Sequence, residues 1–259
     1  MAAAAGRNLI AARGLGKSFG GLSVLRDVDL DVATGEVVAV LGPNGGGKST
    51  LLKILAGVMR AGTGRLEVLG EELFPGRPSP AVLRRLGYVG HDALVYRDLS
   101  PRENLEFFAR AYGRSPAEAA AAATAALERC RLTAAAERPT HVLSRGMLQR
   151  LAIARATLHE PDLLLLDEPF SGLDPAAAGD LDRVLAARRD EGRATVLVTH
   201  DVALVPRLAT RAVLVAGGRA RDLGPTPDPD VLAAAYRDAA GGRRRHGDAG
   251  QLGDVGDRP

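Results

Sequence analysis

Apolar and polar positions along the chain follow three successive patterns. From residue 8 to about 75, short apolar runs alternate with turns, as in LDVATGEVVAVLG, which indicates strands. Residues 98–157 carry helix signals instead, because Ser100 and Ser115 each precede Pro and are followed three residues later by Glu. Strand-like runs then return at 163–167, 194–200 and 211–218. Strands that alternate with helices predict a mainly parallel sheet, with the middle helical block inserted into it.

The pattern weakens near the C-terminus. From about residue 222 the chain reads DLGPTPDPD, then one possible short helix, then GGRRRHGDAGQLGDVGDRP. We expect residues 221–259 to form a largely flexible tail. The run Arg243-Arg244-Arg245 could touch lipid headgroups or nucleic acid, but a solvated tail is the favoured interpretation.

Composition narrows the class of protein. A chain of 259 residues with 46% hydrophobic and 25% charged residues is typical of one large globular domain, or of a core with an inserted subdomain. The net charge of +3 comes from mixed acidic and basic residues, so no nucleic-acid partner is expected. Cys130 is the single cysteine, which excludes an intrachain disulfide and a cysteine-built metal site. No apolar run approaches the roughly 18 to 20 residues that cross a bilayer, and MAAAAGRNL does not resemble a signal peptide, so any membrane role must come through a partner.

A glycine-rich stretch, GPNGGGKST, follows a predicted strand at 36–41 and precedes the apolar-periodic TLLKILAG. It matches the pattern G-x-x-x-x-G-K-[ST], in which glycines let backbone N–H groups curl around phosphate oxygens at a helix N-terminus. Lys48 adds a compact charge for the terminal phosphates, and Ser49 offers a hydroxyl to Mg²⁺. The chain otherwise uses Arg almost everywhere, and Arg is not equivalent to Lys at such a site. The predicted nucleotide loop comprises Gly42, Pro43, Asn44, Gly45, Gly46, Gly47, Lys48, Ser49 and Thr50.

Acidic residues and a histidine follow two later apolar strands. In LLLLDEP, Asp167 stands at the carboxyl end of a strand, where it can hold Mg²⁺, and Glu168 beside it can polarise an attacking water. The other interpretation, a strand followed by a solvated acidic turn, is weaker after a phosphate loop. Asp174 in SGLDP suits either a helix cap or a functional role, and both stay open. His200 ends an apolar strand at the edge where such sheets bind ligands, which favours a place near the terminal phosphate.

In this order the motifs resemble the ATP-binding cassette of ABC transporters over residues 8–220. The resemblance implies an α/β, P-loop NTPase fold with a RecA-like, mainly parallel core, an N-terminal antiparallel β subdomain and a helical subdomain inserted at about 92–157. It also implies that Phe19 stacks on adenine, that Glu168 is the general base, and that His200 senses the γ-phosphate. ATP and Mg²⁺ are then the expected cofactors, with Ser49 and Asp167 on the metal.

The octapeptide LSRGMLQR at 143–150 occupies the position where this family carries LSGGQ. In the family this motif contacts the phosphate bound by the other subunit of a cassette pair. Ser144 and Gly146 remain, whereas Arg145 replaces Gly and Met147 replaces Gln. Ser144 can also cap the following helix, and a capped helix end is compatible with anion binding. We expect a working variant, with Arg145 turned outward or adding charge near the phosphates, and with Ser144, Arg145, Gly146 and Asp174 acting in trans.

A second departure lies in GYVGHD, where Gly90-His91 stands at the position of the Pro-Gln pair of most cassettes. Together with the residues that follow, to about 112, it is similar to the haem exporter ATPases of cytochrome c maturation. Related exporters of drugs and other small molecules share much of it. We expect His91 to line the ATP site, as a weak Mg²⁺ ligand or by holding a water; a loop histidine without a ligand is the alternative.

The resemblance predicts an ATPase that powers a separate membrane permease, as an exporter of the haem and cytochrome c biogenesis type. The alternatives are an ATPase of another small-molecule or drug exporter, and a soluble ABC ATPase that remodels a protein complex. A chromosome or translation ATPase is disfavoured, because the chain has no long heptad insertion and no concentrated basic surface. The expected partners are a second cassette and integral membrane permease subunits, at the cytoplasmic, inner face of the cell membrane.

Overall fold

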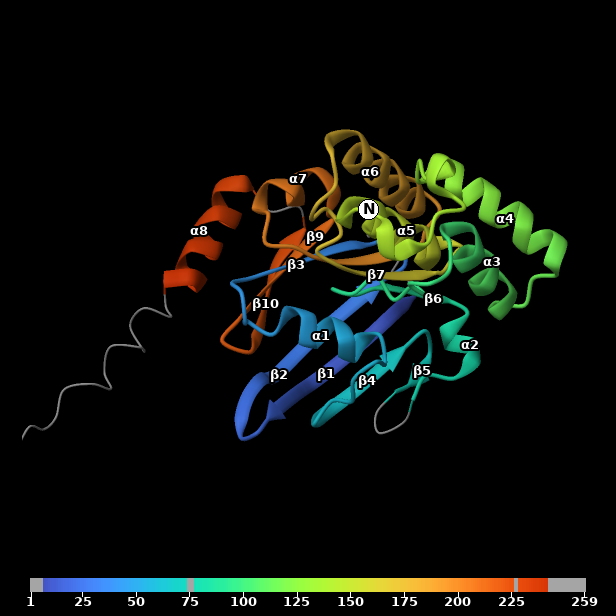
Figure 1. Cartoon of the computed structure of the whole chain (residues 1–259). Helices are drawn as coiled ribbons and strands as arrows, with labels where there is room; N and C mark the ends of the chain where they lie inside the picture. The colour runs from blue at the N-terminus through green and yellow to red at the C-terminus, as the bar shows by residue number, and fades with distance from the viewer. Residues whose placement is uncertain (1–6, 74–76, 226–227, 242–259) are drawn as a thin grey trace, which may run out of the picture.

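The chain folds into two β-sheets with helices packed around them (Figure 1). The computed structural model describes residues 7–73, 77–225 and 228–241. One sheet has four strands in the order β2-β1-β4-β5, and the other has six in the order β10-β9-β3-β8-β7-β6. This arrangement confirms the predicted α/β fold class, with an antiparallel sheet at the N-terminus and a mainly parallel core.

The antiparallel sheet is built on a long hairpin. β1 (Asn8–Phe19) and β2 (Leu22–Ala33) are joined by Gly20 and Gly21, whose φ angles of 52° and 84° are those that a tight hairpin turn needs. β4 (Thr63–Val68) pairs with β1, and β5 (Glu71–Glu72) extends the edge. One face of this sheet closes over the main core.

The second sheet carries the strands after which most of the expected site residues come. β3 (Val37–Leu41), β7 (Leu163–Asp167) and β8 (Ala194–Val198) are buried at every residue, which is typical of parallel strands covered on both faces. β6 (Leu86–Val89) lies parallel to β7, and β9 (Arg211–Ala216) lies parallel to β3. The last strand, β10 (Arg219–Pro225), runs antiparallel to β9. The loops after β3, β7 and β8 therefore leave the sheet at one edge.

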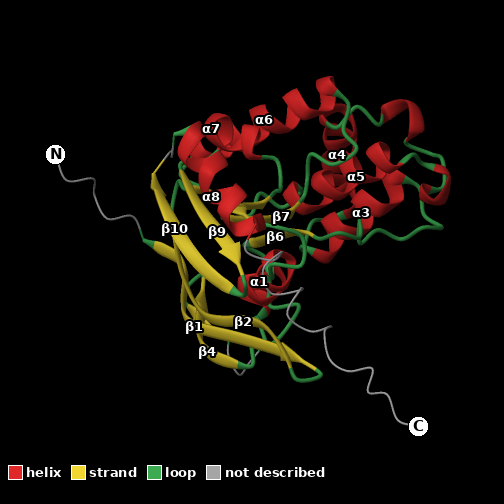
Figure 2. Cartoon of the chain, turned by 90° about the vertical axis from the view of Figure 1, so that its left-hand side faces the viewer, coloured by secondary structure: helices red, strands yellow, loops and turns green. Residues whose placement is uncertain are grey.

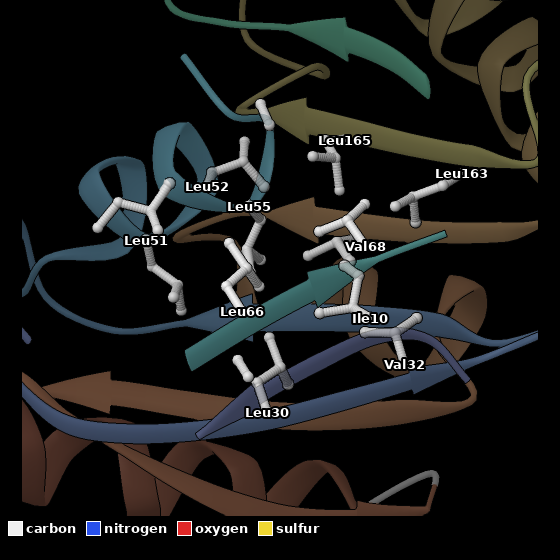
Figure 3. Packing of buried hydrophobic residues seen from close by; sticks show 14 of the residues in the cluster. Ile10, Leu30, Val32, Leu51, Leu52, Leu55, Leu66, Val68, Leu163 and Leu165 are labelled. Atoms are coloured by element: carbon white, nitrogen blue, oxygen red, sulfur yellow. The ribbon is translucent and has the colours of Figure 1, made fainter. Parts of the chain in front are cut away.

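Figure 3 shows the core where the two sheets meet. Leu52 and Leu55 of α1 (Lys48–Leu55) pack against Leu163 and Leu165 of β7 and against the antiparallel sheet. Each of these leucines is at most 1% exposed. Burial of such side chains is worth roughly 1.5 to 3 kcal/mol each, so α1 and the loop before it are held firmly.

Three helices form the predicted helical block, gathered on one side of the sheets (Figure 2). They are α3 (Pro101–Ala111), α4 (Pro116–Arg129) and α5 (Arg145–Thr157). Both predicted capping boxes are confirmed, because the side chains of Ser100 and Ser115 each accept a hydrogen bond from the glutamate N–H three residues on, and the serine backbone N–H donates to that glutamate's carboxylate. The remaining helical elements are α2 (Pro80–Leu83), η1 (Thr133–Ala135), η2 (Thr140–Val142), α6 (Pro175–Asp190), η3 (Val202–Leu204), α7 (Val205–Leu208) and α8 (Pro229–Gly241).

The C-terminal region differs from the expected flexible tail. Residues 219–225 form the edge strand β10, and α8 packs on β9 and η3. Leu232 of α8 is fully buried beside Leu41. The apolar pattern of the sequence does not indicate these two elements clearly. β10 is a mostly polar edge strand, and α8 buries one large side chain among alanines. Residues 242–259, with the arginine run, lie outside the described residues.

Candidate functional site

The loop after β3 depends on glycines for its path. Gly42, Gly45 and Gly47 have φ angles of 149°, 69° and 105°, which other residues rarely adopt. A Cβ on Gly42 would lie 2.0 Å from the Val215 carbonyl oxygen, and one on Gly46 would lie 2.8 Å from the same oxygen. The loop therefore needs glycines because it passes close to β9, in addition to any need to approach a phosphate.

The loop ends at the N-terminus of α1, which is open to an anion. Gly47 occupies the N-cap position in a left-handed conformation, no side chain caps the helix, and the first turn contains no acidic residue. Ser49 and Thr50 lie in this first turn, and Ser49 is exposed. Uncapped N–H groups and the helix dipole together favour a phosphate here.

Lys48 is buried beneath the loop that precedes it. Its side chain is 7% exposed, and Nζ donates to the carbonyl oxygens of Gly42 at 2.7 Å and Pro43 at 3.2 Å. A buried ammonium needs such acceptors, and a phosphate oxygen is a further one that it can serve. The structure thus holds this charge at the loop that the sequence identified.

Asp167 ends β7 and is 5% exposed. Its Oδ1 is buried and has no hydrogen-bond partner among the described residues. A buried carboxylate oxygen without a partner is costly unless a cation or donor is supplied. The half-buried Tyr88 phenol lies in the field of this carboxylate: burial, and then the charges of Asp167 and Asp92, raise its pKa, so it stays protonated.

Glu168 follows in a strained backbone conformation. Its φ of 49° is left-handed, and its N–H donates to the Val198 carbonyl at 3.0 Å, which ties the turn to β8. Glu168 Oε2 lies 2.9 Å from His200 Nδ1. This distance brings the imidazole directly beside the carboxylate that follows Asp167. His200 itself lies two residues beyond β8, in the loop, rather than at the strand end that the sequence predicted.

These groups meet at an open cleft of about 630 Å³, which we call the central cleft. Of the residues predicted from sequence, its lining includes Asn44, His91, Arg145, Asp167, Glu168 and His200. They come from five separated segments of the chain, so the fold assembles what the sequence disperses.

The helix that begins at Arg145 meets the loop after Glu168. Ser144 caps α5 by accepting a hydrogen bond from the Met147 N–H at 3.3 Å, as the structural interpretation predicted. A Cβ on Gly146 would lie 2.6 Å from the Gly172 carbonyl oxygen, so only glycine fits. Arg145 is exposed at the edge of the central cleft, and its Nη2 donates to Ser171 Oγ at 3.2 Å within its own chain, a contact that the sequence did not predict.

Three other predicted residues lie around this arrangement. Asp174 caps α6, its Oδ1 accepting from the Ala177 N–H at 2.8 Å, as one of its two interpretations held. Phe19 is 46% exposed at the end of β1, with Lys17 Nζ 5.3 Å from the centre of its ring. Gly90 is buried, and a Cβ there would lie 2.6 Å from the Tyr88 hydroxyl, so the Pro of most cassettes would displace that ring.

Sequence reasoning missed several residues of the central cleft. Ser171 and Gln149 line it, and Gln149 Nε2 donates to the Pro169 carbonyl at 3.1 Å. Both stood inside quoted motifs. Spacing could have indicated Gln149, since Arg145 and Gln149 share one face of a helix at i, i+4, whereas no spacing indicates Ser171. Asp92 and Arg97 also line the cleft, and no pattern in the sequence singles them out.

The residues present fit a magnesium ion accompanied by a nucleotide. Among residues 7–73, 77–225 and 228–241, no three His, Cys, Asp or Glu side chains come together as a metal cage. Mg²⁺ is commonly held by one or two carboxylates together with substrate phosphates, and the unpartnered Asp167 Oδ1 and the exposed Ser49 meet that need. Within the described chain, no helix is long and apolar enough to span a membrane.

Comparison with known proteins gives a consistent family. The sequence model described as "ABC transporter" matches residues 25–171. A probable ABC transporter ATP-binding protein of Azorhizobium caulinodans is 34% identical over 226 residues, covering 87% of this chain and 79% of the relative. The molybdenum import ATP-binding protein ModC of Mycobacterium tuberculosis is 39% identical over 78% of this chain, which spans 57% of that relative. The Nod factor export ATP-binding protein I of Cupriavidus metallidurans is 36% identical over 80% of this chain and 68% of the relative.

Solved structures agree with the sequence comparison. The ATP-binding subunit of an ABC transporter superimposes with a TM-score of 0.78 at 31% identity, over 88% of this chain and 99% of that one. A dimeric ATP-binding cassette bound to ADP and Pi has a TM-score of 0.77 at 24% identity, over 85% of this chain and 99% of that one, and shows a common fold.

Proposed function

The chain belongs to the ABC transporter family of ATP-binding proteins, and from that premise we propose that it is the nucleotide-binding subunit of a transporter whose permease is a separate chain. It is an ATPase of the ABC type. The observation that carries the proposal is the convergence of Asn44 of the phosphate loop, Asp167 and the Glu168–His200 pair at one cleft.

The predicted nucleotide, metal and catalytic residues, in and around the central cleft, have chemical tasks in this proposal. The glycine loop and Lys48 bind the phosphates of ATP, and Phe19 offers an exposed ring to adenine. Ser49 and Asp167 would hold Mg²⁺, which when bound neutralises charge on the phosphate oxygens. Glu168 accepts the proton of the attacking water, and His200 holds that carboxylate in place while it faces the terminal phosphate.

A second cassette completes the site in this proposal. The α5 N-terminus, with Ser144 and Gly146, would face the phosphates bound by the partner copy, and the adjacent loop to Asp174 would lie in the same interface. In this chain Gly146 also packs against Gly172, so a substitution there disturbs its own loop as well as the contact in trans.

Exposed aromatic and apolar side chains support docking to a membrane partner. Leu94, Tyr96 and Phe107 are 51%, 50% and 45% exposed, and the Tyr96 and Phe107 rings lie 4.9 Å apart, edge to face. Such a patch on a surface otherwise rich in charge marks an interaction site. We propose that it binds the permease, and that the chain works at the inner face of the membrane.

The finer proposal, export of haem, depends on the resemblance of Gly90-His91 and the residues to 112. The relatives named above include a molybdenum importer and a Nod factor exporter, so the family covers both directions of transport and several cargoes. Export of another small molecule is the second candidate, and remodelling of a soluble complex is the third.

A pull-down from native membranes tests the proposal. Tagged Glu168→Gln protein is extracted in gentle detergent with ATP, and the co-purifying chains are identified by mass. We expect a stoichiometric multi-span partner, and cytochrome-maturation features in that partner would support haem. Phe107→Asp should reduce its recovery at least fivefold, whereas Val231→Asp, at an exposed position of α8, should not. Recovery of soluble partners alone would exclude the transporter.

A further inference from the structure

Arg145 is the departure from the family motif that the structure explains most specifically. Its guanidinium reaches across the central cleft edge to Ser171, with Nη2 3.2 Å from Oγ. Its side chain also covers Gly172, where a Cβ would lie 3.7 Å from the arginine Cγ and Cδ. A glycine at position 145, as in the usual motif, would make neither contact.

The loop that Arg145 contacts is the one that carries the proposed base. Ser171 N–H donates to the Glu168 carbonyl at 3.1 Å, and Leu173 N–H donates to the Phe170 carbonyl at 3.2 Å, so the segment is a compact turn. It ends at Asp174, which caps α6. A force on Ser171 is therefore transmitted to the Glu168 backbone through one hydrogen bond.

Two further contacts join α5 to the same loop. Gln149, one turn beyond Arg145 on the same helix face, donates to the Pro169 carbonyl at 3.1 Å. Gly146 packs on the Gly172 carbonyl without room for a Cβ. Arg145, Gly146 and Gln149 thus hold the loop at three successive points.

We propose that Arg145 is a positioning residue within its own chain, which holds the loop from Glu168 to Asp174 against α5 through Ser171. The inference rests on the proposed function, because it concerns the regulation of the same ATPase site. Its consequence is that the helix end offered to the partner's nucleotide and the loop that carries the chain's own base move as one unit. ATP bound at one site then influences hydrolysis at the other.

A different role for Arg145, direct contact with a phosphate in trans, makes distinct predictions. A phosphate ligand lowers KM for ATP and does not need Ser171. A positioning residue acts on the reacting geometry, so its loss lowers kcat with little change in KM, and its effect depends on Ser171.

A double-mutant cycle separates the two roles. Steady-state ATPase rates are measured with Mg²⁺-ATP for wild type, Arg145→Ala, Ser171→Ala and the double variant of the full chain. We expect each single variant to lower kcat about fivefold with KM within twofold, and the double variant to be no slower than Arg145→Ala. Arg145→Lys, which retains a donor, should recover at least half of the rate.

Controls tie each outcome to one conclusion. Arg150→Ala removes an arginine of the same helix whose Nη1 donates to the Cys130 and Arg131 carbonyls, away from the central cleft, and should leave kcat unchanged. Thermal unfolding midpoints within about 2 °C of wild type show that each variant is folded. Additive losses in the double variant, or a raised KM for Arg145→Ala with a silent Ser171→Ala, would overturn the positioning role. A wild-type rate no higher than that of Glu168→Gln would instead reject the proposed function itself.

Discussion

Single residues decide the path of the phosphate loop. Gly42 has a φ of 149° and no room for a Cβ, which would meet the Val215 carbonyl oxygen at 2.0 Å. The atom in the way is backbone, so it cannot be relieved by a rotamer change. We infer that this position is fixed by its neighbours as strongly as by its ligand.

Gly42→Ala should therefore abolish nucleotide binding and lower the free energy of unfolding by about 2 to 4 kcal/mol, as expected for overpacking plus strain. Gly192→Ala is the matched control, because Gly192 has a φ of 76° with no atom within 4 Å of the added Cβ. It should cost about 1 kcal/mol and leave binding intact. Urea unfolding and ATP titration measure both; equal losses in the two variants would contradict the steric explanation.

His159 makes stability depend on acid. Burial first, and then the charges of Arg155, Arg188 and Arg114, lower its pKa to about 4 from 6.5, although its hydrogen bond to the Leu86 carbonyl opposes the shift. The unfolded chain takes up a proton near pH 6.5 while the native chain stays neutral. The contribution of neutral His159 to the free energy of unfolding is therefore complete above pH 6.5. As the pH falls toward 4, the free energy of unfolding decreases by on the order of 2 to 3 kcal/mol.

Substituting His159→Phe removes this titration and keeps a ring against Tyr112, with which the imidazole stacks at 3.8 Å. We expect the free energy of unfolding to become flatter between pH 6.5 and 4, as measured by urea denaturation at each pH. His141→Phe, at an exposed position, is the control and should keep the wild-type slope. An unchanged slope in His159→Phe would show that other groups cause the acid sensitivity.

At this scale the sequence predicted groups but not their contacts. Lys48, Asp167 and Glu168 were predicted as site residues because phosphate and metal chemistry restricts residue type and spacing. The hydrogen bond from Arg145 to Ser171 joins positions 26 apart, so no local pattern could indicate it. The predicted strand that ends at His200 was two residues too long. The apolar run ends at Val198, and Thr199 remains buried although the strand has already ended.

Secondary-structure elements were predictable where their boundaries carry their own chemistry. The Ser-Pro-x-Glu sequences predicted the starts of α3 and α4. The run of four leucines in β7 predicted a buried strand. β10 was not predicted, and α8 was expected only as one possible short helix in a flexible tail, because the order of both elements comes from tertiary contacts. β10 is held by pairing with β9, and Arg211 of β9 bonds Asp222 of β10 at 2.8 Å.

A single side chain anchors α8, so the helix should respond to one substitution. Leu232 is fully buried against Leu41 and its neighbours, whereas Val231 beside it is 54% exposed. Leu232→Ala should destabilise the chain by about 2 to 5 kcal/mol, and Val231→Ala by less than about 0.5 kcal/mol. Thermal unfolding of the two variants measures the difference; similar midpoints would indicate that α8 does not belong to the folded core.

At the scale of the whole molecule, the proposed pairing with a second copy depends on two neighbouring segments. The α5 N-terminus and the loop to Asp174 lie next to each other, and the proposed function assigns both to one interface. The fold class could be predicted from the alternation of strands and helices. The surfaces that remain exposed and available to partners depend on tertiary packing, which the sequence pattern does not show. Pairing in solution is therefore tested on the full chain.

We expect Glu168→Gln protein to double its mass on addition of saturating Mg²⁺-ATP, because the nucleotide is bound and not consumed. Light scattering after size exclusion measures the change. Glu168→Gln combined with Lys48→Ala is the control and should stay monomeric, since the phosphate charge is lost. A monomer in the first sample, with ATP shown to be bound, would contradict pairing through the phosphates.

The scarcity of lysine turns one buried amine into a chemical reporter. All side-chain amines of the chain belong to Lys17, Lys48 and Lys53. Lys48 is 7% exposed with Nζ bonded to two carbonyl oxygens, while the other two are only partly buried. An acylating reagent should therefore label Lys17 and Lys53 first and reach Lys48 only when its loop opens. The acylated fraction of Lys48, measured by mass spectrometry after brief labelling, would then report how often the loop opens without nucleotide. The decrease of that fraction with nucleotide would report how far the bound nucleotide keeps the loop closed.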